Sequence, residues 1–132
     1  MSYQAFILLP SDSDASIEDV RRILRDYYSD DVRDITFNDN ENKLTVTIDD
    51  WDLSINRNSK PHVIEESREM ADKFAGQRPD KNEIASSGVR LEVSTDDDNN
   101  MDYFNDYLEI IEKLGNFKGA KIWEGAQSEF IN

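Results

Sequence analysis

The stretch "DDDNNMDYFNDYLE", residues 96–109, has the residue types and spacing that most resemble a metal-binding loop. Counted from Asp98, oxygen ligands stand at positions 1, 3, 5 and 12 of a calcium loop of the EF-hand type, supplied by Asp98, Asn100, Asp102 and Glu109. Position 6 of such a loop is Gly because the chain turns sharply there, but here it is Tyr103. The ligand spacing therefore fits calcium, whereas the turn residue does not.

The same stretch has an apolar periodicity that predicts a helix. Apolar residues recur at intervals of three and four between positions 103 and 114. A helix there would wind up the ligand loop, with Asn99 or Asn100 as the N-cap and the acids near the positive end of the helix dipole. We therefore expect no metal site. A small-ligand or metal sensor at Asp96–Asp102 is kept as an alternative.

His62 is the only histidine, and it is the side chain whose ordinary pKa lies nearest neutrality. It stands near the start of a predicted helix, where the dipole disfavours a protonated ring, and Glu65, Glu66 and Glu69 follow it. We expect an exposed residue without a catalytic role. The alternative is an enzyme, or an accessory to one, that uses carboxylates and His62.

Several chemistries are excluded by residues that the sequence lacks. Without cysteine there is no disulfide, no thiolate zinc site and no cysteine nucleophile. Phosphate-binding glycine motifs and the G-x-S-x-G nucleophile motif are absent as well. No basic leader precedes the first apolar run, and no stretch has the length of a membrane helix, so we expect a cytoplasmic protein. We also expect no enzyme activity and no cofactor.

The chain is strongly acidic, since 15 Lys and Arg against 29 Asp and Glu give a net charge of −14. Such a surface repels nucleic acid and anionic membranes and attracts basic proteins. Carboxylates beside aromatic rings suit a basic partner, because both attract cations. The candidate protein-binding surface consists of Asp49, Asp50, Asp52, Asp96, Asp97, Asp98, Trp123 and Glu124. The composition leaves the oligomeric state open.

A group of arginines lies on the first predicted helix. This helix begins after Ser16, which is expected to cap it together with Asp19. Arg21, Arg22 and Arg25 lie mostly off its apolar stripe. We interpret them as a solvent-exposed face paired with nearby acids, and a small anion-binding patch is the alternative.

Periodicity and turn residues predict the other elements. Strands are expected at 3–9, 32–37, 44–48, 51–55 and 89–93, with a last strand or short hairpin within 120–132. Further helices are expected at about 63–74 and 102–114. The irregular stretch 76–88 is a candidate functional loop. Between positions 44 and 55 the apolar residues change from even to odd numbers, which predicts a two-residue hairpin at Asp49-Asp50 with Ile48 opposite Trp51. A bulge there is the alternative, and Trp51 is assigned to sheet packing.

These elements follow one another in the order β-α-β-β-β-α-β-α-β. The order predicts a single α+β domain over residues 1–132, with a mostly antiparallel sheet of about six strands and three helices largely on one face. Its closing β-α-β unit fits a ferredoxin-like variant with a split β-α-β arrangement.

The C-terminal segment, which contains "MDYFNDYLEI" and "GAKIWEGAQSEFI", resembles the ends of small uncharacterised bacterial proteins and of immunity-like proteins that neutralise secreted toxins. The resemblance covers less than a third of the chain and implies a small binding protein. Together with the acid excess, it favours a protein-binding domain without catalytic activity, such as an immunity-type inhibitor of a basic protein.

Overall fold

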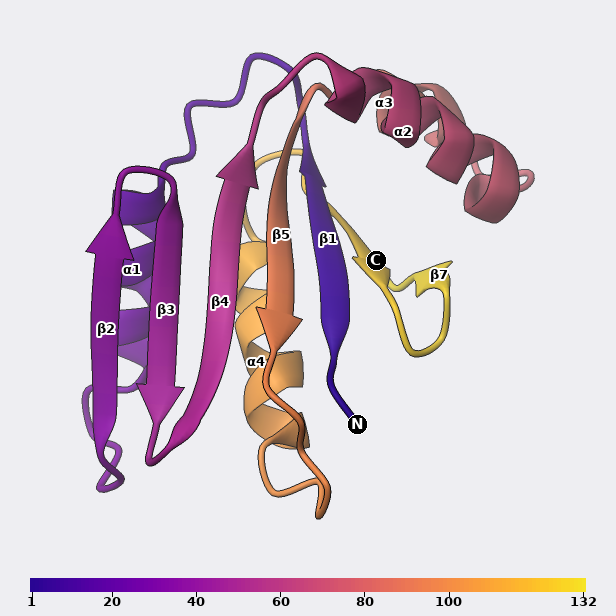
Figure 1. The fold of residues 1–132 in the computed structure, drawn as a ribbon. Helices are drawn as coiled ribbons and strands as arrows, with labels where there is room; N and C mark the ends of the chain where they lie inside the picture. Colours follow the sequence, from indigo (N-terminus) through magenta and orange to yellow (C-terminus); the bar gives the residue numbers. More distant parts are fainter.

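Seven strands form one sheet, in which every neighbouring pair is antiparallel (Figure 1). The computed structural model covers residues 1–132. The strand order across the sheet is β2-β3-β4-β5-β1-β6-β7. The strands are β1 (Gln4–Leu9), β2 (Ile35–Asn40), β3 (Lys43–Ile48), β4 (Trp51–Asn58), β5 (Val89–Thr95), β6 (Lys121–Glu124) and β7 (Glu129–Phe130). The predicted α+β class with an antiparallel sheet is confirmed.

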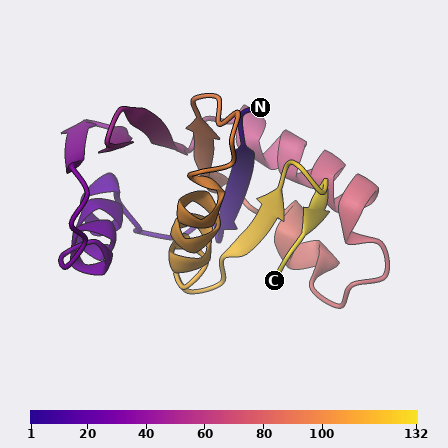
Figure 2. The same cartoon turned by 90° about the horizontal axis from the view of Figure 1, so that it is seen from below.

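Helices lie on both faces of the sheet, so the prediction that they lie largely on one face is wrong. They are α1 (Ile17–Tyr27), α2 (His62–Met70), which continues as the π-helical segment η1 (Ala71–Ala75), α3 (Lys81–Ala85) and α4 (Phe104–Leu114). The view from below shows α1 and α4 side by side on one face (Figure 2). The α2-η1-α3 segment lies on the other face, beyond β1 and β6.

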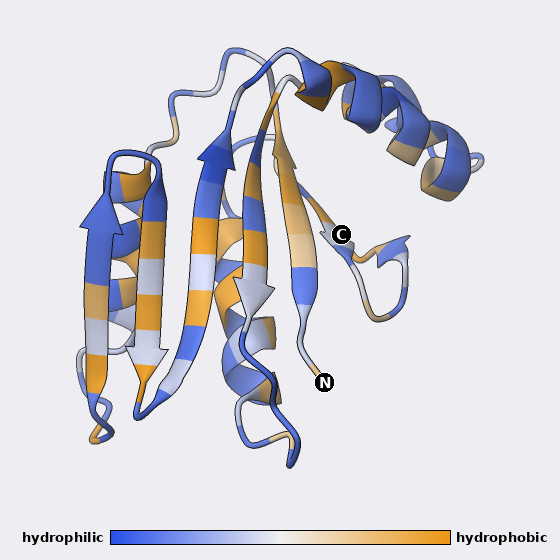
Figure 3. Ribbon diagram, in the orientation of Figure 1, coloured by the Kyte–Doolittle hydropathy of each residue, from blue (hydrophilic) through white to orange (hydrophobic).

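Alternation of side chains explains why α1 and α4 share a face. Along β3, Leu44, Val46 and Ile48 are fully buried, while Thr45 and Thr47 between them are half-buried on the opposite face. The same alternation is visible as orange and pale bands along β3, β4 and β5 (Figure 3). The buried positions join apolar residues of α1 and α4 in a cluster of 24 buried side chains. This cluster is the main core.

Strand β1 is apolar on both faces because it serves two cores. Ala5, Ile7 and Leu9 belong to the main core, whereas Leu8 belongs to a second cluster with Ile84 and residues of η1. The second core explains why the α2-η1-α3 segment packs over this half of the sheet only.

The hairpin at Asp49-Asp50 is confirmed by the register of β3 and β4. Ile48 pairs with Trp51, and Leu44 pairs with Ile55 at the far end of the hairpin. Asp49, the first residue of the turn, has φ = 56°, and a positive φ at this position is common to the two turn types that favour two-residue hairpins. The turn therefore keeps the apolar residues of both strands on one face.

The helix starts differ in how well they were predicted. The capping box is confirmed at α1, where Ser16 Oγ accepts from the backbone N–H of Asp19 and the Asp19 carboxylate accepts from the backbone N–H of Ser16. The cap predicted for α4 is wrong, since α4 begins at Phe104 after Tyr103, which makes no side-chain cap hydrogen bond. Near the start of α4 it is the Asp98 carboxylate that accepts a backbone hydrogen bond, from the N–H of Tyr103.

The numbers of strands and helices differ from those predicted. The structure has seven strands and four helices in place of about six and three, because the stretch 76–88 contains the short helix α3 and the C-terminal segment forms the β6–β7 hairpin. The split β-α-β arrangement is present, with β1 between β5 and β6, which α4 connects.

One large area of sheet has no helix over it. We call it the open face: the side of β2, β3, β4 and β5 that faces away from α1 and α4 (Figure 1). Most of its side chains are small and uncharged. The residues on this face are Thr36, Asn38, Asn40, Lys43, Thr45, Thr47, Asp52, Ser54, Asn56, Asn58, Arg90, Glu92 and Ser94.

Trp51→Ala should lower the free energy of unfolding by about 3–5 kcal/mol, because a buried aromatic ring leaves a large cavity. The ring is 3% exposed, and its Nε1 donates to the Asp96 carbonyl at 3.2 Å. Urea denaturation followed by circular dichroism measures the change. Trp51→Phe keeps most of the packing and should lose less. A loss below about 1 kcal/mol for the alanine variant would contradict the burial of the ring.

Candidate functional site

Carboxylates from two loops meet at one end of the sheet. The β3–β4 hairpin supplies Asp49 and Asp50 from its turn and Asp52 from the start of β4, and the β5–α4 loop supplies Asp96 and Asp102. Two hydrogen bonds join the loops: the Asp52 N–H donates to Asp96 Oδ2 at 3.1 Å, and the Asp96 N–H donates to the Asp52 carbonyl at 2.9 Å. We call these five residues the acidic end. Four of them belong to the surface predicted from the sequence, and Asp102 is new to it.

Three carboxylates of the acidic end lie near a pair of stacked aromatic rings. Trp51 and Tyr103 lie with ring centroids 4.8 Å apart and planes 8° from parallel. Desolvation raises the pKa of the Tyr103 phenol, and the charges of Asp49, Asp50 and Asp102 raise it further. The shared effect on Tyr103 places these carboxylates around a single aromatic side chain.

The negative charges of the acidic end are not neutralised by ion pairs. None of its five carboxylates has a cationic group within 4.0 Å. The neighbouring Asp97 differs, because its Oδ1 lies 3.4 Å from the N-terminal ammonium of Met1. Like charges held together destabilise the folded state, so the arrangement lowers the stability of the free protein.

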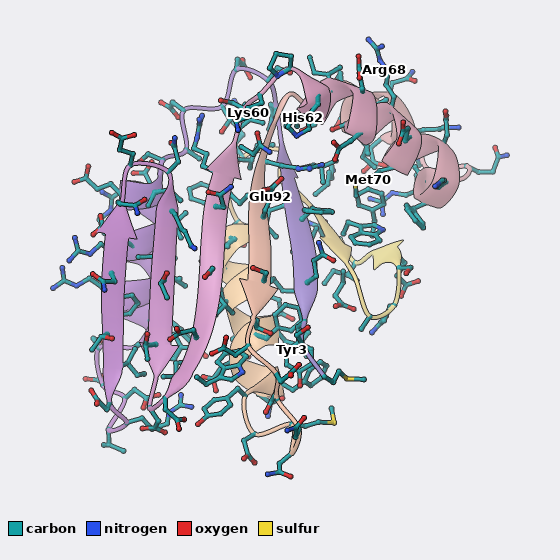
Figure 4. All side chains as sticks on the ribbon, in the orientation of Figure 1. Tyr3, Lys60, His62, Arg68, Met70 and Glu92 are labelled. Carbon is teal, nitrogen blue, oxygen red and sulfur yellow. The ribbon has the colours of Figure 1, made fainter.

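Asp98 was predicted to be part of the binding surface, but it is not exposed. Its side chain is buried, and Oδ2 accepts hydrogen bonds from the Tyr3 hydroxyl at 2.7 Å and from the Tyr103 N–H at 3.0 Å. It therefore anchors the segment before β1 and positions the start of α4. This side chain, not Asn99 or Asn100, satisfies the backbone near the helix start. Figure 4 shows Tyr3 at this end of the sheet.

The calcium alternative from the sequence depended on Asp98 as the first ligand. Nowhere does the structure bring three or more histidine and acidic side chains into an arrangement that could hold a metal ion. Since Asp98 is directed into the protein, the side chains at Asn100, Asp102 and Glu109 do not close around a common point with it.

Glu124 and Trp123 are also separated from the acidic end. Glu124 is buried, and its carboxylate accepts from the Tyr107 hydroxyl at 2.7 Å and from two N–H groups of the β6–β7 turn. Trp123 packs in the second core between Phe6 and Phe74. Both residues stabilise the β6 side of the sheet, and neither lies at the acidic end.

His62 lies on the exposed start of α2, beyond the end of β4 and at the border of the open face (Figure 4). Its Nε2 is 3.7 Å from Glu66 Oε2 and 3.4 Å from Asn58 Nδ2. Arg90, a buried residue, joins the two carboxylates by donating to Glu66 and Glu92 at 2.8 Å each. The network fastens α2 to β4 and β5.

The carboxylate of Glu92 is held in its charged form. Desolvation alone would raise its pKa, but hydrogen bonds from Asn58, Arg90 and Asn56 outweigh that effect, and the pKa lies below its usual value. A general acid needs a raised pKa, so Glu92 does not fit that role. The hydrogen bonds around Glu92 and Arg90 therefore fit a structural role, holding α2 against β4 and β5, better than proton transfer.

A separate pocket lies away from both His62 and the acidic end. It has a volume of about 430 Å³ and is located where β1 ends, beside α3 and the start of β6. His62 does not line it. Two of its serine hydroxyls already bond to backbone carbonyls, Ser11 to Ser86 and Ser87 to Leu9. The pocket therefore offers no activated nucleophile with an adjacent base.

No protein-family model, curated protein or solved structure matches the chain. The fold and the site thus define the protein only as an α+β domain with an acidic end beside an open polar face. No helix combines the length and the apolar character that crossing a membrane requires.

Two substitutions within the acidic loops should have different effects on the free energy of unfolding. Asp98→Asn should lower the free energy of unfolding by about 1–3 kcal/mol, because the new amide is buried with unsatisfied donors. Asp50→Asn should leave stability equal or raise it by a few tenths of a kcal/mol, because it removes an exposed unpaired charge. Urea denaturation at low salt compares them. Equal losses for both variants would contradict the different roles.

The contribution of Tyr3 to the stability of the folded protein should fall as the pH becomes alkaline. Desolvation, followed by the hydrogen bond to Asp98 and its charge, raises the pKa of the Tyr3 phenol to about 12. Because the folded pKa exceeds the ordinary value near 10, this stability is complete below pH 10 and is lost as pH rises towards 12. Tyr3→Phe should be less stable at pH 7 and should lose less stability than the unmodified protein between pH 10 and pH 12. Parallel losses in denaturant midpoint would contradict this.

Proposed function

We propose that the protein is a non-catalytic binding domain that captures a basic protein through the acidic end and the adjoining open face. The observation that carries the proposal is the set of five uncompensated carboxylates, of which Asp49, Asp50 and Asp102 act on the Tyr103 ring of the Trp51–Tyr103 stack. A partner's lysine or arginine would meet both negative charge and an aromatic neighbour there. Its charge would offset the repulsion that the acidic end imposes on the free protein.

The open face provides the rest of the contact area. A row of short polar side chains crosses four strands in register, with Asn38 beside Thr45, Thr45 beside Ser54, and Ser54 beside Ser94. Side chains of this kind form adaptable hydrogen bonds in protein interfaces at a low cost in side-chain entropy. The row is adjacent to the acidic end through Asp52, whose carboxylate accepts from Thr47 at 2.6 Å.

An inhibitor of immunity type, as the resemblance of the C-terminal segment implies, is the particular form of this function that we favour. A toxin that acts on nucleic acid is commonly basic, because its substrate is a polyanion. An acidic inhibitor would then associate rapidly and compete with that substrate for the same surface. A gene for a secreted basic toxin next to the gene for this chain would supply the partner to test.

The proposal predicts that charge at the acidic end controls association. Asp49→Asn, Asp50→Asn and Asp102→Asn together should lower the association rate with the basic partner by about tenfold at 0.1 M salt, with a smaller change in dissociation. Surface plasmon resonance with the partner, or with the product of a neighbouring toxin gene, measures both rates. Asn at position 49 tolerates the left-handed backbone, so the turn is kept.

A matched control removes the same charge elsewhere. Asp12→Asn, Asp14→Asn and Glu18→Gln neutralise three exposed carboxylates near the start of α1, at the other end of the sheet. This variant should bind with a rate close to that of the unmodified chain. If both triple variants lose rate equally, the attraction is general and the acidic end is not the site. If binding is independent of salt, the interface lies elsewhere.

A further inference from the structure

The two edges of the sheet are unequal. β7 contains two residues, which is too short to template another strand, whereas β2 contains six and lies at the other edge with nothing beyond it (Figure 1). Proteins usually protect an edge strand with proline, a bulge, charged side chains or a cover. β2 has no proline, its register with β3 is unbroken from Ile35 to Asn40, and its one charged side chain, Asp39, is paired with Arg21. The β2 edge is therefore able to accept a further strand.

The hydrogen-bonding groups on this edge belong to alternate residues. The Asp34 carbonyl accepts from the Asp49 N–H at 2.7 Å, so position 34 is directed towards β3. In an antiparallel ladder the even positions 36, 38 and 40 then face β3 as well. The N–H and C=O groups of Ile35, Phe37 and Asp39 point outward, and these three side chains lie on the side of the sheet that α1 covers.

A groove runs along this edge between β2 and α1. Ile35 and Phe37 are half-buried on its floor, and Arg21, Arg25 and Tyr28 of α1 also line it. Arg21 binds Asp39 of its own chain at 3.3 Å, yet its Nε is buried without an acceptor. Arg25 has no carboxylate within 4.0 Å. The groove combines incompletely buried apolar side chains with incompletely paired cations.

We propose that the occupant of this edge is the β2 strand of a second copy of the chain, in a two-fold dimer whose sheet is continuous. Antiparallel pairing centred on Phe37 places Phe37 opposite its own counterpart and Ile35 opposite Asp39 of the second copy. All three are outward-facing positions, so each of these opposed pairs exchanges two N–H···O=C hydrogen bonds. A two-fold axis requires such self-complementarity.

The same register supplies charge complementarity. Asp39 of the second copy, placed opposite Ile35, enters the groove that Arg25 lines, and the symmetric contact repeats this pair. The antiparallel arrangement also directs the two acidic ends to opposite ends of the joined sheet, away from each other. The dimer contact thus uses the arginine-rich side of a chain with a net charge of −14 and leaves the acidic end free for the proposed partner.

Sedimentation velocity over a range of protein concentrations tests the dimer. The unmodified chain should show a reversible monomer–dimer equilibrium, and Arg25→Glu should raise its dissociation constant by at least about tenfold, because it places two carboxylates in contact. Arg68→Glu is the matched control. Arg68 is exposed on α2, remote from the edge, and its substitution changes the net charge equally. It should leave the equilibrium unchanged.

Cysteine cross-linking tests the register, since the chain has no cysteine of its own. A hydrogen-bonded antiparallel pair has Cα atoms about 5.5 Å apart, within the range that a disulfide spans. Phe37→Cys should therefore form a disulfide-linked dimer on mild oxidation. A mixture of Ile35→Cys and Asp39→Cys should cross-link too, whereas Ile35→Cys alone should not, because its two copies lie roughly 13 Å apart. Thr45→Cys on β3 is the negative control.

A chain that stays monomeric at every concentration overturns the proposal, and so does a dimer that Arg25→Glu and Arg68→Glu weaken equally. A dimer that cross-links through Thr45→Cys but not through Phe37→Cys assigns the contact to the open face instead. Each of these results leaves the proposed capture of a basic protein standing, because that function depends on the acidic end and not on β2.

Discussion

The alternation of side chains across the sheet is the constraint from which the rest of the structure follows. Strands β2 to β5 are apolar on one side only, so α1 and α4 must cover that side. β1 and the neighbouring β6 are apolar on both sides, and the second core with α2, η1 and α3 forms where they lie. The opposite side of the other four strands has nothing apolar to bury, which is why it remains open and polar.

The turn at Asp49-Asp50 links this packing rule to the candidate site. It must be tight to keep Ile48 and Trp51 on the same face, and so it places two carboxylates at the end of the hairpin. Hydrogen bonds between Asp52 and Asp96 then bring the second acidic loop alongside. The concentration of charge is therefore built on the same backbone contacts that order the core, and it does not arise from exposed side chains that happen to be near.

Local rules predicted the local structure well. Parity at positions 44 to 55 predicted the hairpin, and Ser16 with Asp19 predicted a capping box, because each depends on residues close in sequence. The acidic run 96–98 was harder to interpret. Asp98 is buried because Tyr3, from the far end of the sequence, donates to it, and no pattern within the run marks it as different from Asp96 or Asp97. The same holds for Glu124, whose partner Tyr107 lies on α4.

The position of β1 at the centre of the sheet has a consequence for how the chain acquires its structure. Ile7 pairs with Leu91 on one side and with Ile122 on the other, so β1 is synthesised well before both of the strands that pair with it. The β2–β3–β4 meander can form early from short-range contacts, whereas β1 must wait, with both of its apolar faces unprotected. Long-range pairing of this kind slows folding and exposes intermediates to aggregation. The strand that unites the two cores is thus the segment of the nascent chain that most needs a chaperone.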